Sequence, residues 1–162
     1  METITSGLIE QARVAADLPL VTSPMEIHML RPSSALRYAL AADAIASGST
    51  GLLLALGAGP LSGPFEMPEA FLRGAGVALL PFAALIGFVA RRETLARATV
   101  LAIVAVNALW VVDSFALLAT GWLAPSLIGS AFVIAQALAV GLLAVAQYAG
   151  LRGSLARSVA MA

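Results

Sequence analysis

The chain has 162 residues, of which 60% are hydrophobic and only 11% are charged, whereas a soluble domain of this size usually has about 25% charged residues. This apolar excess is too large for one protein core and predicts a protein embedded in lipid. The nine basic residues, all Arg, balance nine acidic ones, and Cys is absent, which argues against nucleic acid as a partner and excludes a Schiff-base lysine, disulfides and thiolate chemistry.

The first 33 residues do not have the pattern of a membrane span. METITSGLIEQARVAAD lacks a basic region followed by an apolar one, so we expect no cleaved signal peptide. SPME at residues 23–26 fits a capping box and predicts a short helix over about residues 24–30, ending before Pro32. Its candidate docking residues are Met25, His28 and Met29. The helix is interpreted as an amphipathic segment on the inner leaflet or, alternatively, as a docking segment for a partner.

Four apolar segments are long enough to cross a bilayer, at about residues 36–58, 70–90, 98–120 and 125–149. The stretch GAGPLSGPFEMPE is rich in Gly and Pro and is expected to end the first helix. ARRETLAR and GWLAP are expected to separate the later ones. Short loops make sequential helices antiparallel neighbours. The sequence therefore predicts an all-α, up-down-up-down four-helix bundle over residues 34–149, followed by a tail at 150–162.

The arginines indicate an orientation. Eight of the nine arginines lie before or at the start of the first span, between the second and third, or after the fourth, and Arg73 is the exception. By the positive-inside rule both termini are then cytoplasmic, and we expect a bacterial inner membrane. Tyr38 and Tyr148 would be aromatic anchors at the inner interface, and Phe65 and Trp122 at the outer one.

Polar residues recur at membrane depth on three of the spans. The first span carries Asp43, Ser47 and Thr50 on one helix face. The third carries Asn107, Trp110, Asp113 and Ser114 within about half of the helix surface. The fourth carries Gln136 and Gln147, with Gly129, on one face. We interpret them as interhelical hydrogen-bonding groups that converge on a common interior. A pathway for a solute or a proton is the alternative.

Asp113 stands alone in the apolar stretch ALWVVDSFALL. An acid in lipid is expected to face the bundle and to be paired or protonated. Arg73 lies at a similar depth on the second span, so an Arg73–Asp113 pair is one hypothesis, with Trp110 as another donor. Glu69, four residues before Arg73, and snorkelling of the arginine compete with that pair.

The layout resembles small bacterial four-span proteins, including the broad DoxX-like group. The resembling stretches are LRYALAADAIASGSTGLLLAL, GPLSGPFEMPEAFLRGAG and NALWVVDS, within residues 36–148. Members of such families are mostly uncharacterised. The resemblance therefore implies a fold and a membrane location, and it implies no activity or site residue.

Three functions remain open. We expect a non-catalytic accessory or scaffold subunit, which packs against itself or a larger membrane complex and has no cofactor or metal. Its small size, minimal loops and Ala- and Gly-rich surfaces favour this interpretation. A carrier or channel for a small solute or protons, using Asp43 and Asp113, is the first alternative. A lipid- or pigment-binding membrane module with Trp110 in its cavity is the second.

Overall fold

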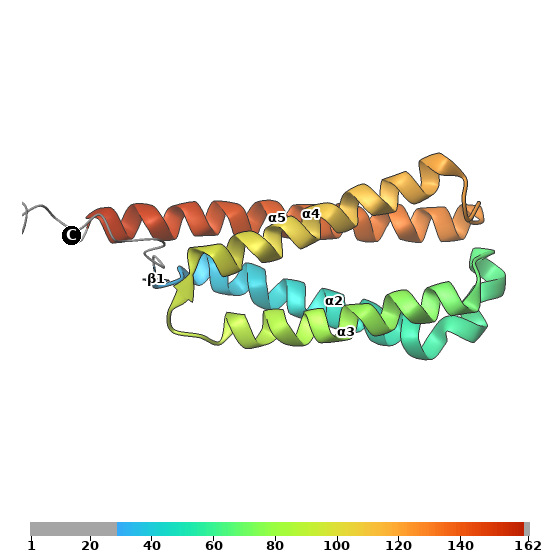
Figure 1. Cartoon of the computed structure of the whole chain (residues 1–162), viewed down its shortest axis with the longest axis horizontal. Coiled ribbons are helices and arrows are strands. Elements are labelled where there is room, and N and C mark those ends of the chain that lie inside the picture. Colours follow the sequence, from blue (N-terminus) through green and yellow to red (C-terminus); the bar gives the residue numbers. More distant parts are fainter. Residues whose placement is uncertain (1–28, 161–162) are drawn as a thin grey trace, which may run out of the picture.

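The structure is a computed structural model that describes residues 29–160. Its helices are α2 (Ser34–Phe65), α3 (Glu69–Ala90), α4 (Arg97–Thr120) and α5 (Leu127–Ala160), and two short strands are β1 (Met29–Leu30) and β2 (Leu95–Ala96). The four helices form two antiparallel pairs, α2 with α3 and α4 with α5 (Figure 1). All four are long and apolar enough to cross a membrane. The predicted all-α, four-span membrane fold is confirmed.

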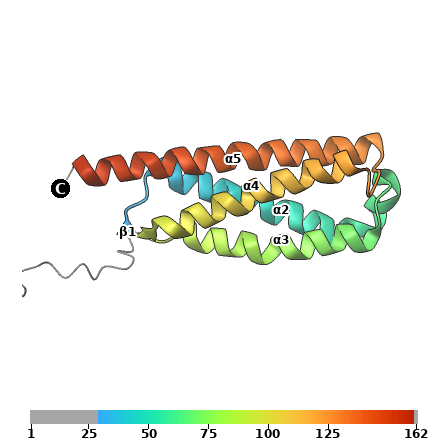
Figure 2. The ribbon, with the colours of Figure 1, turned by 45° about the horizontal axis from the view of Figure 1, so that its top comes forward.

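The two ends of the bundle differ in charge. One end holds β1, the connection from α3 to α4, and the C-terminal part of α5 (Figure 2). We call it the arginine-rich end, because Arg37, Arg91, Arg92, Arg97 and Arg152 lie there. The opposite end holds the turns from α2 to α3 and from α4 to α5, with Glu66, Glu69 and Trp122.

Helix α2 is longer than the sequence indicates. The prediction that its Gly- and Pro-rich stretch ends the helix was wrong, because α2 continues through Pro60 and Pro64 to Phe65. A proline removes only its own donor, and in hydrocarbon the remaining backbone groups have no partner except the helix itself. At the end of α2, Ser126 forms hydrogen bonds to two carbonyl groups: its N–H donates to Phe65 O at 3.0 Å and its Oγ donates to Pro64 O at 2.6 Å.

Helix α5 also exceeds the predicted span, since residues 150–160 of the expected tail are helical. This extension packs against the start of α2. A Cβ on Gly150 would lie 2.9 Å from the Leu36 Cα, so only glycine permits the approach. Ser33 N–H donates to Ser154 Oγ at 3.0 Å, and Ser33 Oγ donates to Gly150 O at 3.3 Å. Tertiary contacts therefore continue the helix past the apolar segment.

Small residues decide which helices touch closely. A Cβ on Gly76 would lie 2.4 Å from the Ala55 backbone nitrogen, so α3 lies directly on α2. A Cβ on Gly129 would lie 2.6 Å from Phe65 O, which brings α5 equally close to α2 at the opposite end. Helix α4 packs on α5, whereas α3 and α4 make little close contact. The prediction that sequential helices are neighbours is therefore wrong for α3 and α4.

Two buried clusters flank the middle of the bundle. The cluster at the arginine-rich end includes Leu36, Leu40, Ile86 and Leu151, and the one at the opposite end includes Leu54, Phe65 and Leu72. Phe65 is buried and its ring lies 5.1 Å from the Phe132 ring, so it is a core residue and not the interfacial anchor expected. Tyr38, Tyr148 and Trp122 are exposed.

The N-terminal segment enters the described part of the chain as a strand. Met29 pairs with Ala96 and Leu30 with Leu95 in an antiparallel ladder. The helix predicted over residues 24–30 is therefore wrong for its last two residues, which lie before Pro32, where helical backbone is disfavoured. Leu30 is buried in the core while Met29 is exposed. Met25, His28 and the rest of that predicted helix lie outside the described residues.

Candidate functional site

A buried polar network crosses the middle of the bundle. Asp43 on α2 is fully buried, and its Oδ2 accepts hydrogen bonds from Asn107 Nδ2 on α4 and Gln147 Nε2 on α5, each at 2.6 Å. Its Oδ1 accepts from Ser47 Oγ at 3.1 Å. Asn107 Nδ2 also lies 3.3 Å from Gln147 Oε1. We call these residues the Asp43 network.

This network joins α4 to α2, two helices that have little other contact. Asn107 on α4 donates a hydrogen bond to Asp43 on α2, and this bond connects the α4–α5 pair to the α2–α3 pair. Polar groups buried in an apolar medium are costly unless they are hydrogen-bonded. Here each donor atom of the network, on Ser47, Asn107 and Gln147, has an acceptor within the network, and both oxygens of Asp43 are occupied. It therefore resembles a structural clamp built around the Asp43 carboxyl group.

A cavity of about 720 Å³ lies between α3 and α4, nearer the opposite end of the bundle. Its α3 wall is apolar and mostly small, and its α4 wall is more polar. Helices α2 and α5 form its floor. The lining includes Ala70, Phe71, Gly74, Ala75 and Ala78 from α3; Trp110, Asp113, Ser114 and Thr120 from α4; and Leu54, Phe132 and Gln136 from the floor. We call this cavity the crevice.

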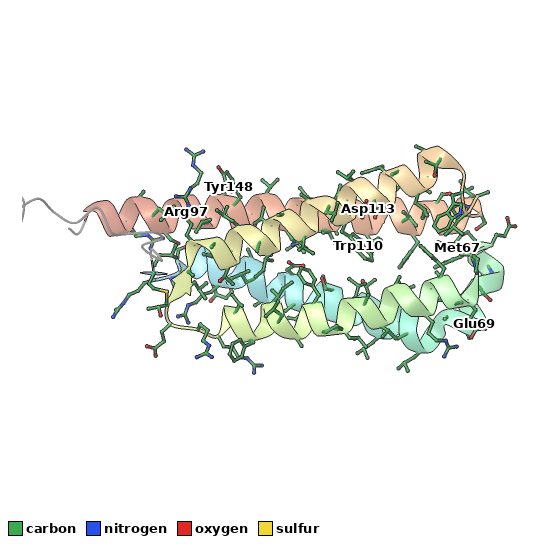
Figure 3. All side chains as sticks on the ribbon, in the orientation of Figure 1. Met67, Glu69, Arg97, Trp110, Asp113 and Tyr148 are labelled. Carbon is green, nitrogen blue, oxygen red and sulfur yellow. The ribbon has the colours of Figure 1, made fainter. Side chains whose placement is uncertain are left out.

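The crevice exists because α3 and α4 are held by different neighbours. Gly76 fixes α3 on α2, while α4 packs on α5. Figure 3 shows Trp110 on the side of α4 that faces the other helix pair. At the opposite end, Trp122 and Phe71 meet edge to face, with ring centroids 6.3 Å apart. Since α2 and α5 form the floor, the open side of the crevice between α3 and α4 faces the bilayer.

A second cavity, of about 330 Å³, continues from the crevice toward the middle of the bundle. The two cavities share Ala78, Trp110 and Gln136 in their walls. The second is also lined by Ser47, Thr50 and Asn107. The polar residues singled out in the sequence are therefore arranged in series: Asp113 in the crevice, Trp110 and Gln136 at the junction, and the Asp43 network behind it.

The predicted pair between Arg73 and Asp113 is wrong. Arg73 forms its ion pair with Glu69, one turn before it on the same helix. Local pairs of this spacing form without closing the gap between helices, and α3 and α4 stay apart. Asp113 is exposed, and within the described part of the chain no group forms a hydrogen bond or ion pair with it.

Trp110 does not bond Asp113 either. Its indole Nε1 is buried and has no hydrogen-bond partner among the described residues, although its ring lines both cavities. Its backbone oxygen accepts from Ser114 Oγ at 2.7 Å. Ser114 is thus satisfied by its own helix, which leaves Asp113 and the Trp110 indole as the unpartnered polar groups on this stretch of α4.

Sequence reasoning missed the α3 side of the site and the turn after α4. Phe71 and Gly74 on α3 and Trp122 in that turn were not among its site candidates, yet all three line the crevice. A Cβ on Gly74 would meet nothing within 4 Å, so this glycine faces open space rather than a helix. FLRGAG contained both kinds of glycine, Gly74 and Gly76, and the sequence carries no signal that separates them. Residues 29–157 contain no group of three His, Cys, Asp or Glu side chains placed to hold a metal ion.

The fold and these two sites define a small multi-pass membrane protein with four candidate spans and a crevice between its helix pairs. Comparisons of the chain with known protein families, curated proteins and solved structures gave no match. The DoxX-like layout therefore stays a resemblance.

Proposed function

We propose that this membrane protein binds a small apolar or amphiphilic molecule from the bilayer in the crevice between α3 and α4, and catalyses no reaction on it. One observation carries the proposal: a cavity of about 720 Å³ separates two helices that are adjacent in the chain. Ligand pockets typically measure roughly 300–1,000 Å³ and are mostly apolar with a few polar groups. The crevice fits both criteria.

The walls of the crevice support a ligand more than a packing defect. On α3 they are Ala, Gly and Phe side chains, which leave room, while Asp113, Thr120 and Gln136 supply polar groups on the facing side. An acid without a partner at membrane depth destabilises the fold, and such residues usually mark a functional site. A carrier that uses both acids is less well supported, because Asp43 is fully buried and its oxygens are occupied by the network.

An accessory subunit that packs against a second copy or a larger membrane complex is the second candidate. The observation that favours it is two short rows of small, exposed residues on α4, each with members spaced three or four apart. They are Ala98, Ala102 and Ala105, and Ala116 and Ala119. Such rows allow close helix contact in membranes. In this function a partner helix would pack on the exposed alanines of α4, of which Ala116 also lines the crevice.

Filling the crevice from α3 tests the first candidate. Gly74→Leu adds a side chain where the structure has open space, and Gly153→Leu is the matched control, since a Cβ there also meets nothing within 4 Å. Both proteins are purified in native nanodiscs, and small molecules that co-purify are quantified by mass spectrometry. We expect a compound that is stoichiometric in the wild type and in Gly153→Leu but lost in Gly74→Leu. Equal recovery from all three proteins, or none from any, would contradict the proposal.

Partner proteins are scored in the same samples. A stoichiometric protein that dissociates from Gly74→Leu, or a stable homo-oligomer with no small molecule, would favour the accessory subunit instead. Native mass spectrometry of the intact particle distinguishes the two.

We also propose that the protein lies in a bacterial inner membrane with both termini in the cytoplasm. The support is the clustering of Arg37, Arg92, Arg97 and Arg152 at one end of the bundle. Reporter fusions after Arg157 and between residues 62 and 66 test it. The first should report the cytoplasm and the second the outside, and reversed signals would overturn the orientation.

A further inference from the structure

The charge of the crevice carries an inference that rests on the proposed function and names the class of ligand. Among the residues that the structure describes, Asp113 is the one charged residue that lines the crevice, and no Arg lines it. Arg73, on the neighbouring helix α3, is ion-paired with Glu69. We infer that the crevice binds a lipophilic cation, an amphiphile with an ammonium-like or phosphonium-like charge, and that the Asp113 carboxyl group is its counter-ion.

The position of Asp113 supports this assignment. It lies seven residues before the end of α4 at Thr120, which is about 10 Å of helix, so it sits within the hydrocarbon-spanning part of the bundle. Acids at this depth almost always pair with another group or face a water-filled space. Asp43 obeys the rule through its own network. Asp113 has no such donors, and a bound cation would supply the missing partner.

Aromatic side chains line the same space. Trp110, Phe71 and Trp122 are all in its walls, and the last two meet edge to face. The face of an aromatic ring attracts a cation, Trp most strongly. A carboxyl group together with aromatic walls and an apolar remainder is the combination that suits a cation bearing hydrocarbon groups. A small hydrated ion would find too few oxygen ligands.

Other ligand charges fit less well. An anionic lipid would meet Asp113 with no base among the lining residues to offset its charge. A neutral molecule could fill the apolar part but would leave Asp113 unpaired. Specificity for the cation thus follows from what the crevice lacks as well as from what it offers.

The test uses probes of matched shape and different charge: tetraphenylphosphonium as the cation, tetraphenylborate as the anion and tetraphenylmethane as the neutral compound. The chain has two Trp residues, so Trp122→Phe leaves Trp110 as the sole indole reporter in the crevice. Binding is followed in nanodiscs by quenching of Trp110 fluorescence, with empty nanodiscs subtracted, and by equilibrium dialysis of radiolabelled probes.

We expect saturable binding of tetraphenylphosphonium and at least tenfold weaker binding of tetraphenylborate. Asp113→Asn should weaken cation binding at least tenfold, Asp113→Glu should retain it, and Glu93→Gln should leave it unchanged as a matched loss of one exposed acid at the arginine-rich end. Circular dichroism and size-exclusion chromatography establish that each variant folds.

Two outcomes separate the inference from the proposed function. If all three probes bind alike and Asp113→Asn changes nothing, while Gly74→Leu abolishes binding, the crevice is a ligand site and the cation class is wrong. If no probe binds saturably and Gly74→Leu has no effect on any co-purifying compound, the proposed function itself is wrong, and the inference falls with it.

Discussion

Two acids lie in the same membrane domain, and they are treated in opposite ways. Asp43 is fully buried and accepts hydrogen bonds from Ser47, Asn107 and Gln147. Asp113 is exposed and has no partner within the described residues. Asn107 and Asp113 lie on the same helix, about 9 Å apart along its axis. Both acids thus lie on membrane-spanning helices and share the same chemistry, and the difference comes from how many donors helix packing brings to each.

That difference has a packing origin. Close contacts of α2 with α5 at Gly129 and Gly150 hold Gln147 against Asp43. Asp113 lines the crevice, whose other wall, α3, is held against α2 at Gly76. Helix packing therefore brings hydrogen-bond donors to Asp43 and brings none to Asp113 within the described residues. An acid with satisfied oxygens stabilises the fold, and an acid beside a cavity remains available to a ligand.

The largest expected effect is from Asp43→Leu. Removing the acceptor leaves the amide groups of Asn107 and Gln147 buried without their main partner, at about 1–2 kcal/mol each. We expect a loss of about 2–4 kcal/mol in the free energy of unfolding, measured in mixed micelles by denaturant titration followed by circular dichroism.

A triple variant is its control. Asp43→Leu combined with Asn107→Leu and Gln147→Leu removes donors and acceptor together, and replacing a whole buried polar set by apolar residues is often neutral. It should recover at least half of the loss. If the triple variant is less stable than the single one, the cost lies in packing and not in unpaired donors.

Asp113→Leu should act with the opposite sign. No hydrogen bond is broken, and an acid that faces hydrocarbon is replaced by an apolar side chain. We expect stability to rise by about 1 kcal/mol in the same assay. A loss comparable to that of Asp43→Leu would show that Asp113 has a structural partner and would remove the contrast between the two acids.

The sequence predicts one half of this contrast well and the other poorly. The spacing of Asp43 and Ser47 placed them on one face, and the polar faces of α4 and α5 pointed to Asn107 and Gln147. Periodicity reports which residues of a helix share a face, so a network among polar faces could be anticipated. Four spans followed from composition and segment length for the same local reason.

The crevice could not be anticipated, because it depends on which helices touch. Gly74 and Gly76 are two residues apart and look alike in the sequence, yet one faces open space and the other lies against Ala55. Arg73 was in the same position: the sequence offered Asp113 on the third span and Glu69 on the same helix as partners, and the separation of α3 and α4 leaves Glu69. Likewise, the continuation of α2 through Pro60 and Pro64 depends on its hydrocarbon surroundings and on Ser126, far along the chain.

Gly74→Ala should produce a smaller change that also separates the two sides of α3. Alanine in a helix is favoured over glycine by about 0.8–1.0 kcal/mol, and a Cβ at Gly74 meets nothing within 4 Å. We expect stability to rise by up to about 1 kcal/mol in the denaturant assay. Gly76→Ala is the matched contrast and should destabilise, since its Cβ would lie 2.4 Å from a backbone nitrogen. Equal effects of the two substitutions would show that α3 is not held against α2 as described.

The smallest expected effect is from Asp43→Asn, which tests whether the Asp43 network depends on the negative charge of Asp43. Both amide donors converge on one carboxyl oxygen, Oδ2, while Ser47 Oγ contacts the other. An asparagine can place its carbonyl oxygen where Oδ2 lies and still accept both. Its NH₂ group then donates to Ser47 Oγ, whose own proton can turn to the carbonyl of residue 43, one turn earlier.

All the hydrogen bonds of the network therefore have counterparts in the variant. Those to a neutral acceptor are weaker than those to a charged one, but the variant also avoids the burial of a charge. The two terms oppose each other, so we expect stability within about 1 kcal/mol of the wild type, measured in the same micelles as Asp43→Leu. If Asp43→Asn instead loses as much as Asp43→Leu, the network depends on the negative charge itself, and hydrogen-bond geometry alone does not explain why an acid occupies this position.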